Sequence, residues 1–463
     1  MPELPEVETV RKILLRIVKN KTIEKIVVLR AKNIISGAEE FVASLTGETF
    51  LDVTRKGKYL IFHLTHDKVV ISHLRMEGKY YEGKVGDTPD KFDLLIYEFK
   101  DGTTLRYNDV RKFGVLQRTD ESHYFKELPL SKLGPEPWGV TAQELYQGLQ
   151  KRKNTLIKEA LLDQTLIAGL GNIYDDETLF AAKINPKRLS GDIPLAECES
   201  LLKEARRILE EAIANGGSTI RSYHPEEGVD GLMQNELLAY GQENKPCPNC
   251  GFPLRKIFIG GRGTVYCPHC QVYFHHPLIV AVTGPIASGK STVSAYLEKK
   301  GYLKLDADEI VKELYEKPAL QKQIAHLLGA DVLTPNGLDH ALMSERLKAN
   351  PKKKKALEKK IHPLVYKKIL AKLASMDGGK VVLDVPLLLG SPLEEMSDLI
   401  IAVFASEKNQ IARLVERGKD PETALLINAH YPKAALKKKA GLILNTDGSV
   451  ASLTKELDSY RFL

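Results

Sequence analysis

Two residues at the start of the chain could carry covalent chemistry. Pro2 follows Met1, and Glu3 places a carboxylate directly beside it. We expect Met1 to be removed because a proline follows it, and this would free a secondary amine whose pKa lies well below that of lysine. Such an amine can attack an aldehyde-like carbon to form an iminium, while the carboxylate moves protons. The alternative is an ordinary start in which Pro2 has no chemical role.

Four cysteines have the spacing of a metal site. They form the pattern C-x2-C-x16-C-x2-C, which two knuckles of a zinc ribbon need for tetrahedral thiolate coordination. The alternative is a pair of disulfides, which a reducing cytoplasm disfavours. We therefore expect one structural Zn²⁺ and give the fifth cysteine, Cys198, no role. The predicted zinc ligands are Cys247, Cys250, Cys267 and Cys270.

A third motif carries phosphate chemistry. The apolar run 278–283 predicts a buried parallel strand, and a helix is expected from Val293. Between them lies a P-loop, whose backbone N–H groups would wrap phosphates at the helix N-terminus. We expect Lys290 to reach the phosphate oxygens of ATP and Ser291 to bind Mg²⁺. The predicted nucleotide-binding residues are Gly284, Pro285, Ile286, Ala287, Ser288, Gly289, Lys290, Ser291 and Thr292.

Composition indicates a globular protein with more than one core. The chain has 463 residues, of which 43% are hydrophobic and 27% are charged. No apolar run approaches the ~20 residues that a membrane span needs. The first residues also lack the basic-then-apolar pattern of a signal peptide. We expect a cytoplasmic monomer that does not bind membranes.

The net charge of +7 lies in the second part of the chain. Residues 278–463 contain 29 Lys and Arg against 22 Asp and Glu, whereas residues 1–277 contain 38 of each. DNA binding in the first part would therefore depend on clustered cations that face a groove. The run of four lysines at 352–355 is interpreted as the solvated face of a helix, with a DNA-binding patch as the alternative.

The periodicity changes along the first part. Short β-rich runs between residues 20 and 120 predict a β-sandwich. The Gly134–Pro137 stretch ends this pattern, and from Thr155 the sequence reads as helix, turn, helix. Gly169 and Gly171 would permit a tight turn, and Asn172 at the next helix start could offer its amide to a DNA phosphate. A simple helix-to-helix corner is the alternative.

Residues 1–276 resemble the formamidopyrimidine-DNA glycosylase family, which removes oxidised purines and then nicks the strand. The resemblance rests on the opening PELPEVETV, on 55–60 (RKGKYL), 73–78 (HLRMEG) and 107–114 (YNDVRKFG), and on the Gly-Leu-Gly-Asn turn. It implies double-stranded DNA with oxidised purines or abasic sites as the partner. The sequence departs from the family at Gly261, where glutamine is usual, and at Gln242, where arginine is usual.

The resemblance assigns roles to individual residues. Pro2 would be the nucleophile and Glu3 its acid or base, while Lys58, Asn172 and Arg262 would grip the sugar-phosphate around the lesion. The 221–228 loop would read the base edge. The side chains of Met76, Arg111 and Phe113, exposed at the tips of their loops, would fill the gap left by the flipped base. The alternative is that Met76 and Phe113 are core residues. The remaining predicted DNA contacts are His73, Met76, Arg111 and Phe113.

Residues 278–463 resemble dephospho-coenzyme A kinase, which phosphorylates a ribose 3′-hydroxyl. The matching pieces are 306–308 (DAD), 361–364 (IHPL) after a helix, 381–388 (VVLDVPLL) and 445–448 (NTDG). Asp308 is the predicted base that accepts the hydroxyl proton. Asp384 is the predicted acid that holds the water shell of the bound metal ion. Arg413 and Arg417 fit the family's lid region, but the following helix carries Leu425 and Leu426 where the family usually has arginines.

The resemblances together predict a multi-domain architecture. The expected domains are an N-terminal β-sandwich at 1–133, a helical helix-two-turn-helix domain at 134–236, a zinc ribbon at 237–276 and an α/β P-loop kinase domain with a parallel sheet at 278–463. Three functions remain open: a bifunctional enzyme that also uses dephospho-CoA, a glycosylase with a weakly active nucleotide-binding module, or a non-catalytic DNA-binding protein. The Pro2-Glu3 pair argues against the last.

Overall fold

A computed structural model of the protein describes residues 1–217, 236–273, 276–418, 420–429 and 431–463. The chain forms two compact units. The first comprises residues 1–243 and 256–266, and the second comprises residues 244–255 and 267–463. The boundaries of the four predicted domains are finer than this division and stay a prediction. Within the described residues, every helix is too short or too polar to cross a membrane.

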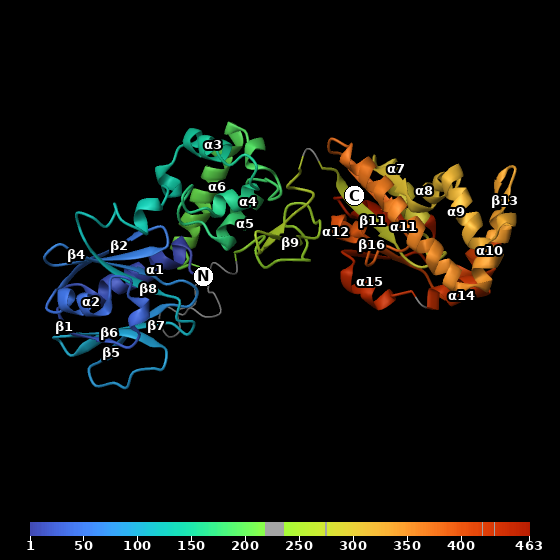
Figure 1. Ribbon diagram of the computed structural model, residues 1–463. Coiled ribbons are helices and arrows are strands. Elements are labelled where there is room, and N and C mark those ends of the chain that lie inside the picture. The colour runs from blue at the N-terminus through green and yellow to red at the C-terminus, as the bar shows by residue number, and fades with distance from the viewer. Residues whose placement is uncertain (218–235, 274–275, 419, 430) are drawn as a thin grey trace. The chain divides into compact units, whose positions relative to one another are not determined.

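The first unit begins with a β-sandwich, as the sequence predicted. Its two sheets and first two helices lie together at the start of the chain (Figure 1). The core is lined by apolar side chains from both sheets and from these helices. Neighbouring strands within each sheet are antiparallel. One sheet contains, in spatial order, β1 (Ile23–Val28), β6 (Asp93–Phe99), β7 (Thr103–Asn108) and β5 (Lys79–Lys84); the other contains β2 (Phe50–Lys56), β3 (Tyr59–Leu64), β4 (Lys68–His73) and β8 (Val115–Asp120).

Helix α1 (Leu4–Val18) packs against this sandwich and fixes the position of the chain start. Its apolar residues recur every three or four positions, which places them on one face of a helix. That face is buried against the core, and α1 contacts β2. The short helix α2 (Ala38–Leu45) packs nearby, against β1. Pro2 and Glu3 are therefore held at the start of a packed helix.

The helical part of the first unit follows the sandwich. It contains α3 (Ala142–Gln150), α4 (Ile157–Leu162), α5 (Asn172–Ala181) and α6 (Leu195–Ala214). Helix α6 packs against α1, α3 and α5, so it joins the chain start to the helical core. A hairpin of β9 (Arg255–Ile259) and β10 (Arg262–Tyr266) then packs against α5. Its turn residues Gly260 and Gly261 both have positive φ, as tight hairpin turns require.

The second unit is built on the predicted parallel sheet. All neighbouring strands are parallel, and the strand that leads into the P-loop lies at the centre. The spatial order is β12 (Leu303–Asp306), β15 (Lys380–Asp384), β11 (Leu278–Thr283), β16 (Leu399–Phe404) and β17 (Leu442–Asn445). From β11 the chain passes to β12 and β15 on one side of the sheet and then to β16 and β17 on the other side. The point where the connections change side is where open parallel sheets bind ligands.

Helices cover this sheet and extend it into a helical region (Figure 1). The apolar side chains of α8, α9 and α11 form one core with β12 and β15. The helices are α7 (Lys290–Lys299), α8 (Ala307–Tyr315), α9 (Pro318–Leu328), α10 (His340–Ala349), α11 (Pro351–Ala374), α12 (Pro392–Met396), α13 (Glu407–Glu416), α14 (Pro421–Ala429), α15 (Lys433–Lys439) and α16 (Val450–Ser459), with a small hairpin of β13 (Leu333–Thr334) and β14 (Gly337–Leu338).

Helix α11 corrects one expectation. The sequence predicted that a helix would end before residues 361–364, but α11 continues through Pro363. Proline removes one backbone hydrogen bond there and disfavours the helix. Buried residues at Leu357, Ile361, Val365 and Ile369 keep the four-residue spacing across the proline and hold the helix on the core. Tertiary packing has therefore overridden the local signal.

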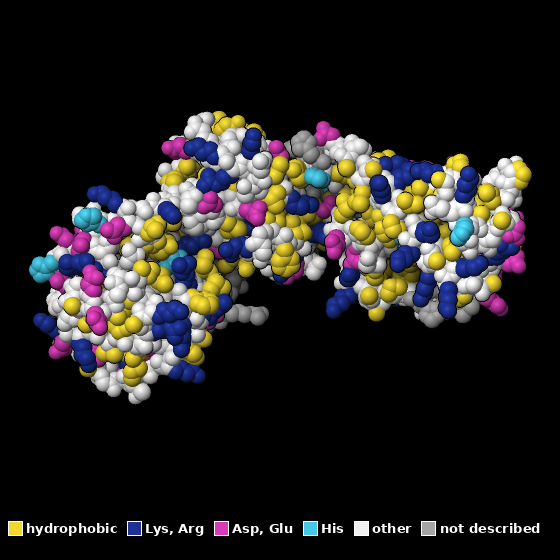
Figure 2. All heavy atoms as spheres, viewed as in Figure 1, with side chains coloured by type: hydrophobic (Ala, Val, Ile, Leu, Met, Phe, Trp, Pro, Cys, Tyr) yellow, Lys and Arg dark blue, Asp and Glu magenta, His cyan; other side chains and the backbone are white. Residues whose placement is uncertain are grey.

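The four lysines at 352–355 lie in the first turns of α11, and all but Lys353 are exposed. On the face drawn in Figure 2, basic side chains are interspersed with acidic and apolar ones over each unit. Exposure alone fits both a solvated helix face and a DNA-binding patch, so the interpretation of the lysine run stays a prediction.

Candidate functional site

Glu3 caps the N-terminus of α5. Its carboxylate accepts hydrogen bonds from the backbone N–H groups of Gly171 at 2.8 Å, Ile173 at 2.9 Å and Tyr174 at 3.3 Å. The side chain is buried, and burial raises the pKa of Glu3 while the charge of Lys58 lowers it. A buried carboxyl with a raised pKa holds a proton more readily than an exposed one, as a general acid requires.

The chain terminus and Lys58 lie beside this carboxylate. Burial lowers the pKa of the terminal amino group on Met1, and the charges of Glu3, Glu6 and Lys58 also act on it. Lys58 is buried, and its Nζ donates a hydrogen bond to the carbonyl of Leu170 at 2.7 Å. Burial also lowers the pKa of Lys58. The structure therefore gathers the two predicted catalytic groups of the chain start and the predicted catalytic lysine.

The two glycines of the helix turn serve different purposes. Gly169 has φ +106°, a conformation that only glycine adopts easily. Gly171 has an ordinary backbone, but a Cβ there would lie 2.3 Å from the Glu3 side chain. The sequence predicted that both glycines would permit a tight turn. At Gly171 the structural reason is instead the space that Glu3 occupies.

Asn172 ties this helix start to the hairpin. Its Nδ2 donates a hydrogen bond to the carbonyl of Gly263 at 2.8 Å, next to Arg262. Arg262 is exposed on the first residue of β10, and its charge acts on Lys58. The three predicted phosphate-gripping residues therefore lie in one region, although the Asn172 amide already has a protein partner. Its contact with a DNA phosphate stays a prediction.

His73 ends β4, and Met76 lies in the loop that follows. His73 is buried, and its Nδ1 accepts a hydrogen bond from the backbone N–H of Arg75 at 2.9 Å. Burial, assisted by the charges of Arg75 and Lys58, lowers the pKa of His73 to about 3, so the ring is neutral. Met76 is 39% exposed, which excludes the alternative of a core residue. The predicted base-reading loop 221–228 lies outside the described residues.

A buried aspartate shapes the second predicted DNA-contacting loop. Asp109 accepts hydrogen bonds from the backbone N–H groups of Arg111, Phe113 and Gly114 at 2.7 to 2.9 Å. This holds Phe113 outward, 54% exposed, with the Arg111 guanidinium 5.0 Å from its ring centre. Phe113 is therefore a tip and not a core residue. Sequence reasoning gave Asp109 no role, although an aspartate that follows a strand and precedes exposed residues often organises a turn.

A second buried charge cluster lies behind Glu3 and was also missed. Lys158 on α4 and two acids on α5, Asp175 and Asp176, are fully buried at their side chains. Lys158 Nζ lies 2.6 Å from Asp176 Oδ1. The sequence did place this lysine within the apolar stretch 156–162. A lysine in such a stretch is more often a solvated residue on a helix surface, so the burial of Lys158 was not predicted.

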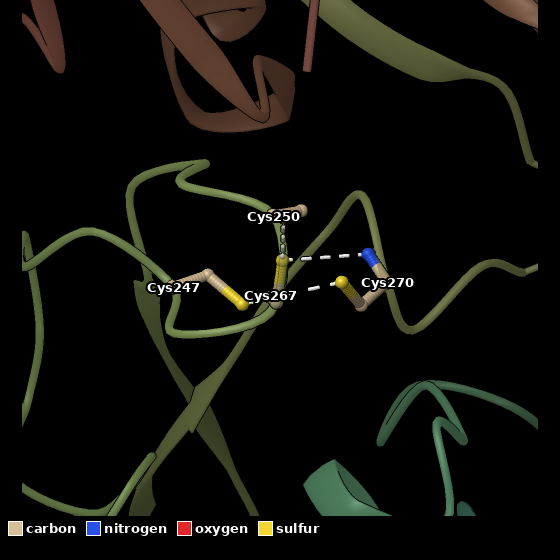
Figure 3. A group of neighbouring side chains, drawn as sticks. All are labelled: Cys247, Cys250, Cys267 and Cys270. Atoms are coloured by element: carbon tan, nitrogen blue, oxygen red, sulfur yellow. Dashed lines mark hydrogen bonds between the residues drawn. The ribbon is translucent and has the colours of Figure 1, made fainter. Parts of the chain in front are cut away.

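The four predicted zinc ligands converge (Figure 3). Their sulfur atoms all lie within 4.8 Å of one another, with Cys250 and Cys267 3.5 Å apart and Cys247 and Cys270 3.9 Å apart. Tetrahedral coordination with Zn–S bonds of about 2.3 Å would separate the sulfur atoms by about 3.8 Å. None of them forms a disulfide. The cluster therefore fits a structural zinc ion.

The P-loop lies between β11 and α7 as predicted. Lys290 Nζ donates hydrogen bonds to the carbonyls of Gly284 and Pro285 at 3.0 and 2.9 Å, so its ammonium is held over the loop. Burial lowers the pKa of Lys290, while the charges of Asp384 and Asp308 raise it. Asp384 ends β15 and accepts a hydrogen bond from Ser294 on α7 at 2.8 Å. This is the position of an acid that supports a bound metal ion.

Asp306 and Asp308 have different environments. Asp306 caps α8 by accepting hydrogen bonds from the backbone N–H groups of Asp308 and Glu309, and it pairs with Lys304 at 3.0 Å. Asp308 is exposed, and its charge acts on Lys290. Asp308 is thus the freer of the two carboxylates to accept a proton, and its role as base stays a prediction.

Two described residues of α14 contact the P-loop through uncharged side chains. Ala424 packs against Ala287 of the P-loop, and Asn428 exchanges hydrogen bonds with the backbone of Ile286. Leu425 lines a cavity with Glu407, Asn428 and Lys433. Ala424 and Asn428 are thus described residues of α14 that contact the P-loop. The prediction that leucines replace the lid arginines stays a prediction.

Arg413 does not compensate for these uncharged residues. Its guanidinium donates hydrogen bonds to the carbonyl of Ala287 at 3.1 Å and to Thr446 Oγ1 at 2.9 Å. These bonds fasten the P-loop to the Thr446 segment and use the guanidinium structurally. The charge of Arg417, an exposed side chain, acts on Lys290.

Comparison with protein-family models finds four matches in one chain. The formamidopyrimidine-DNA glycosylase N-terminal domain matches residues 1–116, and the H2TH domain of the same enzymes matches residues 133–224. The zinc finger found in FPG and IleRS matches residues 244–272. Dephospho-CoA kinase matches residues 278–452. These matches confirm the predicted combination of families.

Individual relatives match the first part over their full length. Formamidopyrimidine-DNA glycosylases from Exiguobacterium sp. and Bacillus subtilis are 48% and 46% identical, and each alignment covers 58% of this chain and 99% of the relative. A crystal structure of wild-type Lactococcus lactis Fpg with DNA that contains N7-benzyl-Fapy-dG is 40% identical, with a TM-score of 0.56. A complex of that Fpg with abasic-site DNA is 38% identical, with a TM-score of 0.55. Both cover 59% of this chain and 100% of the solved one.

Proposed function

The chain belongs to the formamidopyrimidine-DNA glycosylase family, and from that premise we propose that its first part excises oxidised purines from double-stranded DNA and then cleaves the strand as a lyase. One observation carries the proposal. The Glu3 carboxylate is fixed by three backbone N–H groups beside the chain terminus, where burial lowers the pKa of the Met1 amino group. Once Met1 is removed, the Pro2 amine would be the nucleophile at this place, with Glu3 as the proton-transfer group.

The damaged nucleotide must leave the base stack before these groups can reach it, at a cost of a few kcal/mol. The exposed tips Met76 and Phe113, together with Arg111, would occupy the gap that it leaves. Asn172 and Arg262 would hold the phosphates that flank the lesion. The buried, neutral His73 keeps the Met76 loop in shape through its bond to Arg75.

With the base extruded, the Pro2 nitrogen would attack C1′ of the sugar while Glu3 protonates the ring oxygen and opens the ring. Loss of the base leaves an iminium between Pro2 and C1′. The iminium acidifies the neighbouring C–H bond, so proton abstraction can expel the flanking phosphates in turn. Lys58 places a positive charge beside Glu3 throughout.

For residues 278–463 we propose binding of ATP with Mg²⁺ and slow transfer of its γ-phosphoryl group to the ribose 3′-hydroxyl of dephospho-CoA. Lys290 and Ser291 would bind the phosphates and the metal ion, and Asp308 would accept the hydroxyl proton. The alternative, a nucleotide-binding module with little activity, is favoured by Ala424, which presents no charge to the P-loop.

Borohydride is expected to trap the protein covalently on duplex DNA that contains an oxidised purine or an abasic site. The hydride would reduce the iminium to a stable amine and fix the sugar to the Pro2 nitrogen. The measurement is a gel-shifted covalent adduct, followed by mass spectrometry of the N-terminal peptide. The adduct is expected on Pro2 after removal of Met1.

Two controls locate the nucleophile. Pro2→Gly retains a terminal amine and is expected to give a trapped species in reduced yield. A protein whose N-terminus is blocked by an uncleaved extension has no such amine and should give none. An adduct of undiminished yield in the blocked protein would rule out the terminal amine and move the nucleophile to a lysine.

Loss of zinc is expected to weaken DNA binding while leaving ATP binding unchanged. The β9–β10 hairpin that carries Arg262 is short, and metal coordination closes the ribbon from which it extends. Cys267→Ser, or chelation of the metal, should reduce the slope of log Kd against log salt by about one, as expected for one lost phosphate contact. Fluorescence anisotropy with abasic-site DNA measures this.

Cys198→Ala is the matched control, because Cys198 is buried in the helical core and far in sequence from the four-cysteine cluster. It should retain zinc and the parent salt slope. Unchanged DNA affinity and slope in a metal-free Cys267→Ser protein would contradict a zinc-dependent Arg262 contact.

A further inference from the structure

A carboxylate without a hydrogen bond is buried next to the catalytic acid. Asp175 lies in the first turn of α5, is fully buried, and has no hydrogen-bond partner for either carboxylate oxygen in the described structure. Buried polar atoms of this kind are rare because they lose their water without replacement. Packing alone therefore does not explain the burial of the Asp175 carboxylate.

The nearby lysine cannot neutralise both acids of the cluster. Lys158 Nζ forms hydrogen bonds with Asp176 Oδ1 at 2.6 Å and with the Asn172 carbonyl at 3.3 Å, and it lies 3.4 Å from Asp175 Oδ2. Asp176 also accepts a hydrogen bond from the backbone N–H of Val265 at 3.0 Å. The Lys158 ammonium is thus hydrogen-bonded to Asp176, and its contact with Asp175 is a longer ion pair.

This arrangement makes Asp175 change charge near neutral pH. Burial raises the pKa of Asp175 to about 7, with Asp176 and Glu3 raising it further and Lys158 opposing them. Burial raises the pKa of Asp176 to about 6. A carboxyl with such a pKa is neutral below pH 7 and becomes negative above it.

Asp175 and Glu3 share the same helix end. Glu3 binds the N–H groups of Gly171, Ile173 and Tyr174, and Asp175 is the next residue along the chain. Their negative charges repel each other, and Asp175 also acts on Lys58. The groups that face Asp175 are thus Lys158 from α4, Asp176 on its own helix, Glu3 before α1, and Lys58 between β2 and β3.

We propose that Asp175 is a positioning residue that controls the charge behind Glu3 and thereby extends base excision to higher pH. The proposal rests on the proposed glycosylase function. When Asp175 ionises, its negative charge disfavours ionisation of Glu3, and Glu3 keeps its proton at a pH where it would otherwise lose it. Protonated Glu3 is the form that can open the sugar ring.

Asp175→Asn tests this directly, because asparagine keeps the size of the side chain and removes the charge. The single-turnover rate of base excision would be measured from pH 5.5 to 9 on formamidopyrimidine-containing duplex. The basic limb of the profile is expected to move to lower pH by roughly one unit, the size of coupling at which two carboxyls titrate as a pair. DNA affinity for an abasic-site duplex and zinc content should match the parent.

Glu177→Gln is the matched control. Glu177 is a buried acid on the same helix, but it accepts hydrogen bonds from the backbone N–H groups of Leu238, Ala239 and Tyr240. Its replacement should lower the melting temperature and leave the basic limb in place. An Asp175→Asn profile that coincides with the parent profile would overturn the proposal. Absence of excision by the parent protein would instead overturn the proposed function.

Discussion

Replacement of Glu3 by glutamine is expected to lower the rate of base excision by roughly 10²–10⁴-fold, the usual contribution of a positioned acid or base. Glutamine keeps the shape of the side chain but cannot release a proton to the sugar ring. Its NH₂ group would also face backbone N–H groups of Gly171, Ile173 or Tyr174, where a carboxylate oxygen now accepts. Release of the damaged base with enzyme in excess over duplex measures the rate.

Glu6→Gln is the informative comparison, because Glu6 is a second acid beside the N-terminus of α5. It accepts hydrogen bonds from the backbone N–H of Glu3 at 2.8 Å and from the Tyr174 hydroxyl at 2.6 Å. We expect a much smaller loss of rate from this variant, through misplacement of Glu3. Affinity for abasic-site DNA should be unchanged in both. Equal losses in the two variants would show that the cluster acts only structurally.

Motifs that lie within one local segment could be predicted from the sequence. The P-loop residues are contiguous, and a strand before and a helix after them follow from local periodicity. The cysteine spacing likewise defines two knuckles, although only the fold brings their sulfur atoms within 4.8 Å. The alternating β runs also predicted the sandwich, because a sheet with one buried face imposes a period of two.

Relations between distant segments could not be predicted. Glu3 and Gly171 are 168 positions apart, so no local pattern indicates that one carboxylate fills the space of a missing Cβ. That Lys158 lies closer to Asp176 than to Asp175 depends on the rotation of α5 against α4. The rotation of α14 also decides which of its residues approaches the P-loop, because neighbouring positions on a helix point about 100° apart.

The kinase-like part is expected to bind ATP with Mg²⁺ and to phosphorylate dephospho-CoA far more slowly than the 1–100 s⁻¹ that is typical of kinases. Lys290 and the loop amides provide the ground-state contacts, so nucleotide affinity should persist. A single arginine over the transferred phosphoryl group is worth roughly 10³–10⁵ in rate. Here Ala424 occupies the facing position, and Arg413 is bonded to Ala287 and Thr446.

Measurement of ATP affinity and ADP release in the same protein tests this expectation. Lys290→Ala should abolish both, whereas Ala424→Arg should raise turnover by at least about 10-fold, with ATP affinity little changed, by placing a guanidinium at the P-loop. Leu425→Arg is the matched control, because neighbouring positions on a helix point about 100° apart, and it should give no rise. Absence of ATP binding would discard the P-loop assignment. A parent turnover of tens per second would show instead that Arg417, whose charge already acts on Lys290, supplies the positive charge.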